Sequence, residues 1–175
     1  MQKSQRKFKR KEVFTRTVPT ITLIVDMSSS MMNIVNNMQM ILRVFNRLAL
    51  AKIIQCKLIL SGTVARTSQF QLLPLPLDDA IIHKIYPSFS GEGISFTMQS
   101  NIQQLRRSDY VWILTDGCIT NDEIDKNYFH QLGIKTHAFY IGSDQYQDTM
   151  QKYFDFVICQ ENTEGLINEI LTLIK

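Results

Sequence analysis

The sequence predicts an α/β fold in which helices cover both faces of a mostly parallel β-sheet. Short runs rich in β-branched and aromatic residues, typical of strands buried on both faces, alternate along the chain with segments of helical apolar spacing. Several of these runs stop abruptly at acidic, serine or glycine residues, as expected where a chain leaves a sheet. This alternation favours consecutive strands joined by crossover helices, and no internal repeat or second domain is apparent.

The strands are expected where apolar runs are bounded by polar residues or glycine. The clearest run, 110–115, reads Tyr-Val-Trp-Ile-Leu-Thr and is followed by Asp116 and Gly117. The alternating run at 67–72 follows another strand after a short loop, so this pair is expected to form an antiparallel hairpin at an edge of the sheet. Strands are expected at 17–26, 56–60, 67–72, 110–115, 134–141 and 154–159.

The helices are expected where apolar residues recur at spacings of three and four. In the longest segment this stripe consists of Ile34, Met38, Ile41, Phe45 and Leu48. Asn121 or Asp122 is expected to cap the helix that Gly133 ends. Helices are expected at 31–52, 77–84, 97–105, 121–132, 146–153 and 163–175.

The composition indicates a globular protein. The 175 residues are 45% apolar and 20% charged, which excludes collagen-like, fibrous and disordered chains. The three cysteines, Cys56, Cys118 and Cys159, are too scattered for a disulfide framework and favour a reducing compartment. No segment has the apolar length of a membrane span or signal peptide, so we expect a cytoplasmic protein.

The charge is distributed unevenly. Residues 1–16 hold seven basic residues and one acidic residue, a charge of +6, so the net +3 leaves −3 for the other 159 residues. We expect 1–16 to be a basic tail or linker before a single domain over 17–175. A contact of this tail with nucleic acid or an acidic partner is the alternative, but no helix-turn-helix or zinc-finger pattern supports it.

Oxygen-bearing side chains gather in three loops expected at the carboxyl ends of strands, where ligands bind in such sheets. The loops are 26–30, 91–97 and 115–117. Asp26 and Asp116 follow runs that should lie side by side, and two neighbouring carboxylates repel unless a cation relieves them. Mg²⁺ takes six oxygens at about 2.1 Å. Asp26, Ser28 and Ser30 present three oxygens from one turn.

The motif at 26–30, Asp-x-Ser-x-Ser before a helix, resembles the first loop of the metal-ion-dependent adhesion site (MIDAS) of von Willebrand factor A-type (vWA) domains. Thr-Asp-Gly at 115–117 resembles the last metal loop of this family, and the glycine-rich segment at Gly91 stands where the family has its middle loop. The resemblance extends over 17–175. It implies a Rossmann-like, doubly wound three-layer sandwich with one antiparallel edge strand.

The resemblance also implies the roles of the site residues. Ser28 and Ser30 would bind Mg²⁺ or Mn²⁺ directly, and Asp26 and Asp116 would act mostly through bound water. The open position on the ion would take an Asp or Glu carboxylate from a partner protein.

The middle loop departs from the family pattern, in which a threonine binds the ion. One alignment places Ile94 at this position, and isoleucine cannot coordinate a metal. A shift of one residue places Ser95 there and keeps a hydroxyl, so Ser95 is preferred on chemical grounds. If Ile94 is the true counterpart, the metal site is weak or vestigial.

Structural roles compete with these functional ones. Asp and Ser residues often cap helices, although capping needs one such residue and not three at alternate positions. Asp116 is also a common residue for starting a turn. Five residues around the loops are expected to contact a partner, with core packing as the alternative for the methionines. They are Met27, Met31, Gly93, Thr97 and Gly117.

The sequence favours a binding protein over an enzyme. It lacks the dinucleotide, P-loop and nucleophile-elbow motifs. Cys118 has no histidine close in sequence to activate it, and His83, His130 and His137 are expected elsewhere. We expect a non-enzymatic, Mg²⁺-dependent protein-interaction module, and the resemblance implies an AAA-type ATPase or a multi-subunit assembly as partner. The alternatives are a scaffold with a degenerate metal site and, less favoured, a metal-assisted phosphohydrolase.

Overall fold

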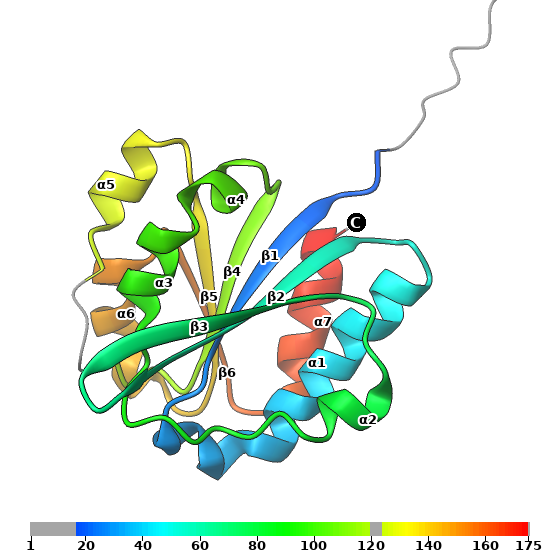
Figure 1. Cartoon of the computed structure of the whole chain (residues 1–175), viewed down its shortest axis with the longest axis horizontal. Coiled ribbons are helices and arrows are strands. Elements are labelled where there is room, and N and C mark those ends of the chain that lie inside the picture. The colour runs from blue at the N-terminus through cyan, green and yellow to red at the C-terminus, as the bar shows by residue number, and fades with distance from the viewer. Residues whose placement is uncertain (1–16, 120–123, 175) are drawn as a thin grey trace, which may run out of the picture.

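A computed structural model describes residues 17–119 and 124–174, which form a six-stranded sheet between two layers of helices (Figure 1). The strand order is β3-β2-β1-β4-β5-β6, and all neighbours are parallel except the hairpin of β2 and β3. The predicted fold class, including the antiparallel edge strand, is confirmed. The strands are β1 (Thr20–Asp26), β2 (Gln55–Val64), β3 (Thr67–Pro74), β4 (Tyr110–Thr115), β5 (Thr136–Ile141) and β6 (Phe156–Gln160).

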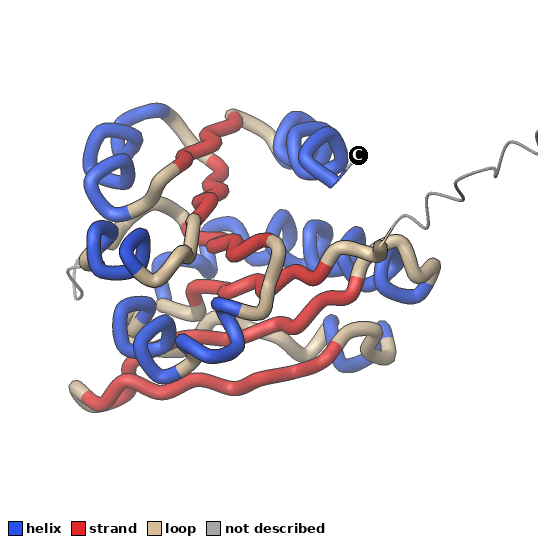
Figure 2. Tube along the Cα trace, turned by 90° about the horizontal axis from the view of Figure 1, so that it is seen from above, coloured by secondary structure: helices blue, strands red, loops and turns tan. Residues whose placement is uncertain are grey.

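The helices divide between the two faces of the sheet, as the views in Figures 1 and 2 show. One face carries the short helix η1 (Ser29–Ile34), α1 (Val35–Leu50), α2 (Asp79–Ile82) and α7 (Thr163–Ile174). The other face carries α3 (Ile94–Ser100), α4 (Ile102–Arg106), α5 (Lys126–Gln131), η2 (Asp144–Tyr146) and α6 (Gln147–Tyr153). No helix in the described ranges is long and apolar enough to cross a membrane.

Each face of the sheet has its own apolar core. Alternate residues of β1 point to opposite faces, so Leu23 packs beneath α1 and α7 while Ile24 packs with the helices opposite. Trp112 of β4 lies at the centre of the first core, where its ring meets Phe45 at 5.6 Å and Phe139 at 5.2 Å, both edge to face. Trp112 is 0% exposed, as expected for a strand buried on both faces.

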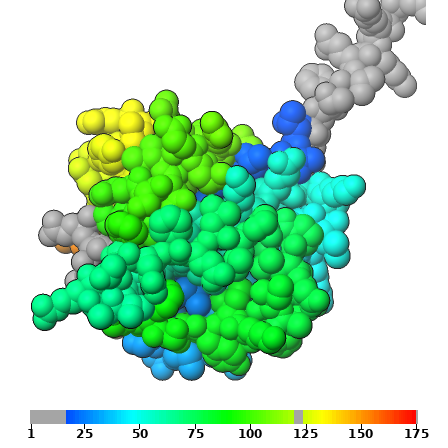
Figure 3. All heavy atoms as spheres, in the orientation of Figure 1, coloured from blue at the N-terminus to red at the C-terminus, as the bar shows by residue number. Residues whose placement is uncertain are grey.

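The hairpin of β2 and β3 projects from one side of the molecule (Figure 3). Its turn has two central residues, Ala65 and Arg66, with φ angles of 47° and 68°. These values belong to the tight hairpin turns that match the twist of the strands, although such turns favour Asn or Gly. A hairpin at this edge is what the short loop predicts.

Several predicted helices differ in the structure: the helix expected at 31–52 is η1 followed by α1, and the helix expected at 77–84 is limited to α2. The helix expected at 97–105 begins earlier, because Gly93 takes the left-handed conformation and lets the chain turn into α3 at Ile94. Asn101 then interrupts the helix, with its side chain donating to the carbonyl of Thr97 at 2.8 Å, and α4 starts anew. Thr97 therefore lies inside a helix and does not cap one.

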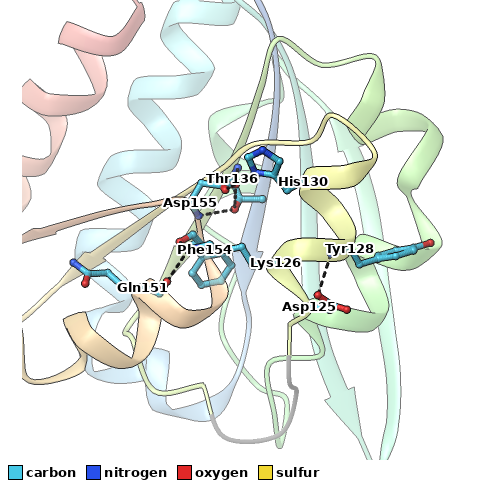
Figure 4. A network of polar contacts seen from close by, with 8 residues as sticks. All are labelled: Asp125, Lys126, Tyr128, His130, Thr136, Gln151, Phe154 and Asp155. Atoms are coloured by element: carbon cyan, nitrogen blue, oxygen red, sulfur yellow. Dashed lines mark hydrogen bonds and ion pairs between the residues drawn. The ribbon is translucent and has the colours of Figure 1, made fainter.

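The helix expected at 121–132 is shorter. It begins at Lys126, where the Asp125 carboxylate accepts a hydrogen bond from the Tyr128 N–H at 2.9 Å (Figure 4). The expected caps, Asn121 and Asp122, lie outside the described residues, as does the basic tail at 1–16. Gly133 ends the helix with φ of 76°, as predicted.

Candidate metal site at the carboxyl edge of the sheet

Parallel pairing of the two central strands brings the first and third loops together. Val25 lies opposite Leu114 in the register of β1 and β4, so the next residues, Asp26 and Thr115, end the strands side by side. The expectation that these two strands are neighbours is confirmed. Asp116 follows directly, which places both predicted carboxylates at one edge of the sheet.

Asp26 is held by hydrogen bonds from both loops. Its Oδ1 accepts from the Ser28 N–H at 2.8 Å, and its Oδ2 accepts from the Thr115 hydroxyl at 2.8 Å. The Thr115 hydroxyl in turn accepts from the Gly117 N–H at 3.2 Å. The side chain is 0% exposed, so the fold fixes its position before any ligand binds.

The environment of Asp26 disfavours its charge. Burial removes water from the carboxylate and raises its pKa from 3.8 to about 6, although hydrogen bonds from Ser28 and Thr115 act in the opposite direction. The negative charge of Asp116 raises this pKa further. A cation bound next to these two acidic side chains would stabilise the charged form of Asp26.

The two serines of the first loop place their hydroxyls together. The Oγ atoms of Ser28 and Ser30 lie 3.0 Å apart. Ser28 occupies the position before η1, but its side chain makes no capping hydrogen bond. Helix capping therefore does not explain why a serine stands at position 28. The free N–H of this turn, that of Ser28, instead donates to the Asp26 carboxylate.

The middle loop is fixed against β2. The Ser61 hydroxyl donates to the Glu92 carbonyl at 2.7 Å, which leaves it to accept from the Thr97 hydroxyl, also at 2.7 Å. Gly93 packs so closely on this strand that a Cβ there would lie 2.7 Å from the Gly62 oxygen. The Thr97 hydroxyl is thus committed to holding the loop.

The two residues offered by the alignments of the middle loop, Ile94 and Ser95, have different surroundings in the structure. Ile94 points into the core with Met98, where it cannot act as a ligand. Ser95 is also buried, and its hydroxyl accepts one long hydrogen bond from Gln99 at 3.4 Å. Ser95 is therefore the middle-loop hydroxyl that is not committed to another loop.

The third loop shows the structural role that competes with metal binding. Asp116 is half-buried, and its Oδ1 accepts from the Cys118 N–H at 3.0 Å, which is a turn-forming contact. Burial raises the pKa of the Cys118 thiol, and the charges of Asp116, Glu92 and Asp26 raise it further.

Glu92 is a buried acidic residue of the middle loop that the sequence analysis did not single out. It is 1% exposed and lies between two glycines of the middle loop. Buried glutamates are rare unless they are paired. The sequence feature that could have drawn attention to Glu92 is its position in a glycine-rich loop, which was expected to face Asp26 and Asp116.

The five residues expected to contact a partner are all buried in this structure: Met27, Met31, Gly93, Thr97 and Gly117. Both methionines belong to the core beneath α1, which is the alternative given above. The exposed apolar side chains next to them in sequence are Met32 and Phe96, at 46% and 43% exposure.

The donor set is mixed. Among the residues that the structure describes, no three His, Cys, Asp or Glu side chains lie close enough to hold a metal ion by themselves. A cation here would depend on the hydroxyls of Ser28 and Ser30 and on water as well as on the aspartates. Hard oxygen donors of this kind suit Mg²⁺, which keeps several of its waters.

Similar folds occur among solved structures. Two structures of SpaC, a pilus adhesin from Lactobacillus rhamnosus GG, align with 91% and 92% of this chain, with TM-scores of 0.57 and 0.62 and identities of 15% and 14%. This chain covers only 30% and 31% of the adhesin. The VWA domain of SpRpn10 aligns with 87% of this chain over 95% of its own length, with a TM-score of 0.56 and 12% identity.

A scan against protein-family models and a search of curated proteins gave no match. At the identities above, similarity to solved structures establishes the fold alone. The fold of this chain is thus vWA-like: a mostly parallel six-stranded sheet with one antiparallel edge strand and helices on both faces.

Proposed function

We propose that this protein is a non-enzymatic interaction module that binds Mg²⁺ at the three-loop edge and, through it, an acidic side chain of a partner protein. The observation that carries the proposal is the buried Asp26 carboxylate, fixed by two loops beside Asp116 and two paired serine hydroxyls. In this arrangement the carboxylate and hydroxyl oxygens would surround a cation, whose positive charge would offset the negative charge of the carboxylates.

Each loop supplies a part of the proposed site. Ser28 and Ser30 would give hydroxyl ligands, Asp26 and Asp116 would give carboxylates, and Ser95 would complete the set from the middle loop. The bound ion would supply a positive charge that accepts a partner's carboxylate. The protein's own contribution is to hold these side chains in place, through the Thr115 and Ser61 hydrogen bonds.

The similar structures support the interaction part of the proposal. One of them is an adhesin and another is a VWA domain. An AAA-type ATPase or a multi-subunit assembly remains the partner class that the resemblance suggests for this chain.

Calorimetric titration of Mg²⁺ and Mn²⁺ tests the proposal. We expect saturable binding to the unmodified protein and none to Asp26→Asn, which keeps the shape of the side chain but not its charge. Asp148→Asn is the matched control, because Asp148 is an exposed aspartate of α6. Equal heats for all three proteins would contradict the proposal.

A second candidate is a scaffold of the same fold whose metal site has decayed. It is favoured by Ile94, which is buried in the core, and by Thr97, whose hydroxyl is bonded to Ser61. The same titration separates the two functions, since a decayed site gives no difference between the unmodified protein and Asp26→Asn. A phosphatase screen of the unmodified protein and Asp26→Asn tests the third function, a metal-assisted hydrolase. That function requires phosphatase activity in the unmodified protein and its loss in Asp26→Asn.

A further inference from the structure

Within the part of the chain that the structure describes, the outer edge of β3 has no neighbouring strand. β3 has eight residues and pairs only with β2, at the end of the strand order. In the view of Figure 2 the outermost strand runs along one border of the molecule. Such an edge presents a row of backbone groups to any chain that can pair with it.

The register shows which backbone groups face outward. Leu75 donates its N–H to the Cys56 carbonyl at 3.0 Å, and hydrogen-bonded pairs alternate along an antiparallel ladder. The groups of Ser68, Phe70 and Leu72 must therefore point away from β2. Pro74, which has no N–H, falls on the same outward set, where a proline is tolerated.

This edge lacks the features that usually prevent pairing. Its sequence, Thr-Ser-Gln-Phe-Gln-Leu-Leu-Pro, contains no charged residue, and its only proline is the last residue. Within the described ranges, no backbone bond outside the sheet engages the N–H groups of Ser68, Phe70 or Leu72.

One face of the edge is apolar and exposed. Phe70 and Leu72 are 37% and 40% exposed and lie on the same side of the strand, because they are two residues apart. Phe96 of α3 extends this surface, with its ring centroid 6.3 Å from that of Phe70. An added strand with apolar side chains at alternate positions would cover these three residues.

The end of β3 leads to a basic hollow. Pro74 lines a hollow of about 590 Å³ together with Lys57, Lys52 and Arg107, and none of the described residues that line it is acidic. The ammonium group of Lys57 contacts the uncharged Gln104 side chain. The carboxylate of Asp109 bonds to the lining residue Thr20, so one acidic group lies beside the three basic lining residues.

We propose that β3 binds an extended segment of a partner protein as an additional antiparallel strand, with an acidic residue at the segment's N-terminal end placed toward the basic hollow. Antiparallel addition brings that end beside Pro74. A second copy of this chain fits less well, because antiparallel self-pairing would bring Arg66 of one copy toward the Lys57 end of the other. The charges thus favour an acidic segment over self-association.

Fluorescence anisotropy with labelled synthetic peptides tests this proposal. The probe has two aspartates followed by eight alternating valines and threonines. One control peptide has lysines in place of the aspartates, and a second carries N-methyl groups on the residues that would bond to β3. We expect the probe to bind, the lysine peptide to bind about fivefold or more weakly, and the methylated peptide not to bind.

Variants of the protein locate the binding. Phe70→Lys should weaken binding of the probe about fivefold to tenfold, while Phe156→Lys, at an exposed position on the opposite edge strand, should not change it. Lys57→Glu should reverse the preference between the aspartate and lysine peptides. Circular dichroism checks that each variant is folded.

Three results would overturn the proposal. They are failure of the probe to bind, equal binding of the methylated peptide, and equal binding to Phe70→Lys. A concentration-dependent dimer that Phe70→Lys abolishes, without peptide binding, would assign the edge to a second copy. Binding of the probe should be unchanged in EDTA and in Asp26→Asn, so this test is independent of the metal site.

Discussion

At the scale of single residues, the proposed function depends on the protonation of Asp26. Burial raises the pKa of this carboxyl from 3.8 to about 6, so the folded protein binds its proton more tightly than the unfolded chain does. The stability that this proton contributes is fully present below pH 4 and is lost as the pH rises through 6. The difference between the two pKa values corresponds to roughly 3 kcal/mol.

The Asp26→Asn variant should remove this pH dependence. In EDTA, we expect its free energy of unfolding, relative to that of the unmodified protein, to rise by roughly 3 kcal/mol between pH 4 and pH 7. Urea unfolding at both pH values measures the change. Asp155 and His137 also have shifted pKa values, but they are present in both proteins and cancel. A difference that does not change with pH would show that Asp26 titrates normally.

Glu92 should contribute to cation binding, because its side chain is buried in the middle loop, three residues before Ser95. We expect Glu92→Gln to weaken Mg²⁺ binding about tenfold, a loss of about 1.4 kcal/mol in binding free energy. Calorimetric titration measures this effect, and Glu164→Gln, an exposed substitution on α7, is the control. Unchanged affinity in Glu92→Gln would assign Glu92 a purely structural role.

At the scale of elements, the site depends on the packing between β2 and the segment that leads into the middle loop. A Cβ on Gly62 would lie 1.6 Å from the Phe89 ring. The backbone of Phe89 bonds to Met27 and Ser29 of the first loop. Displacing this ring should therefore disturb the first loop as well as the strand.

We expect Gly62→Ala to destabilise the protein by about 2–3 kcal/mol and to weaken Mg²⁺ binding. Gly133→Ala is the control, because a Cβ there meets nothing within 4 Å and adds only the strain of its positive φ, about 1–2 kcal/mol. Denaturant unfolding and metal titration measure both properties. A Gly62→Ala variant with normal stability would contradict the packing described here.

The bounds of β4 could be predicted from local sequence, whereas those of β2 and α3 could not, for a physical reason. The apolar run at 110–115 is buried on both faces, so its composition alone marked β4 with the correct bounds. The boundary at Gly93 depends instead on its close approach to Gly62, a tertiary contact that local spacing does not contain. Likewise, the positions of Asp26 and Asp116 at the carboxyl ends of β1 and β4 could be predicted from the apolar runs before them, whereas the burial of Glu92 depends on the folding of a loop.

At the scale of the whole molecule, the sequence predicts that residues 1–16 form a basic tail outside the domain over 17–175. Removing residues 1–16 should therefore leave a folded protein whose melting temperature is within about 4 °C of that of the full chain, a change of about 1 kcal/mol or less. Thermal unfolding followed by circular dichroism tests this prediction. A truncated chain that fails to fold would show that the basic segment is structural.

The central claim is that a bound divalent cation stabilises the folded protein, because the burial of Asp26 disfavours the charged form of this side chain and the cation compensates for it. The most direct test is the free energy of unfolding at pH 7 as a function of Mg²⁺ concentration, for the unmodified protein and Asp26→Asn. We predict that the unmodified protein gains about 2.7 kcal/mol when Mg²⁺ reaches a hundred times its Kd, while Asp26→Asn gains nothing. Equal responses of the two proteins, or no response in either, would contradict the claim.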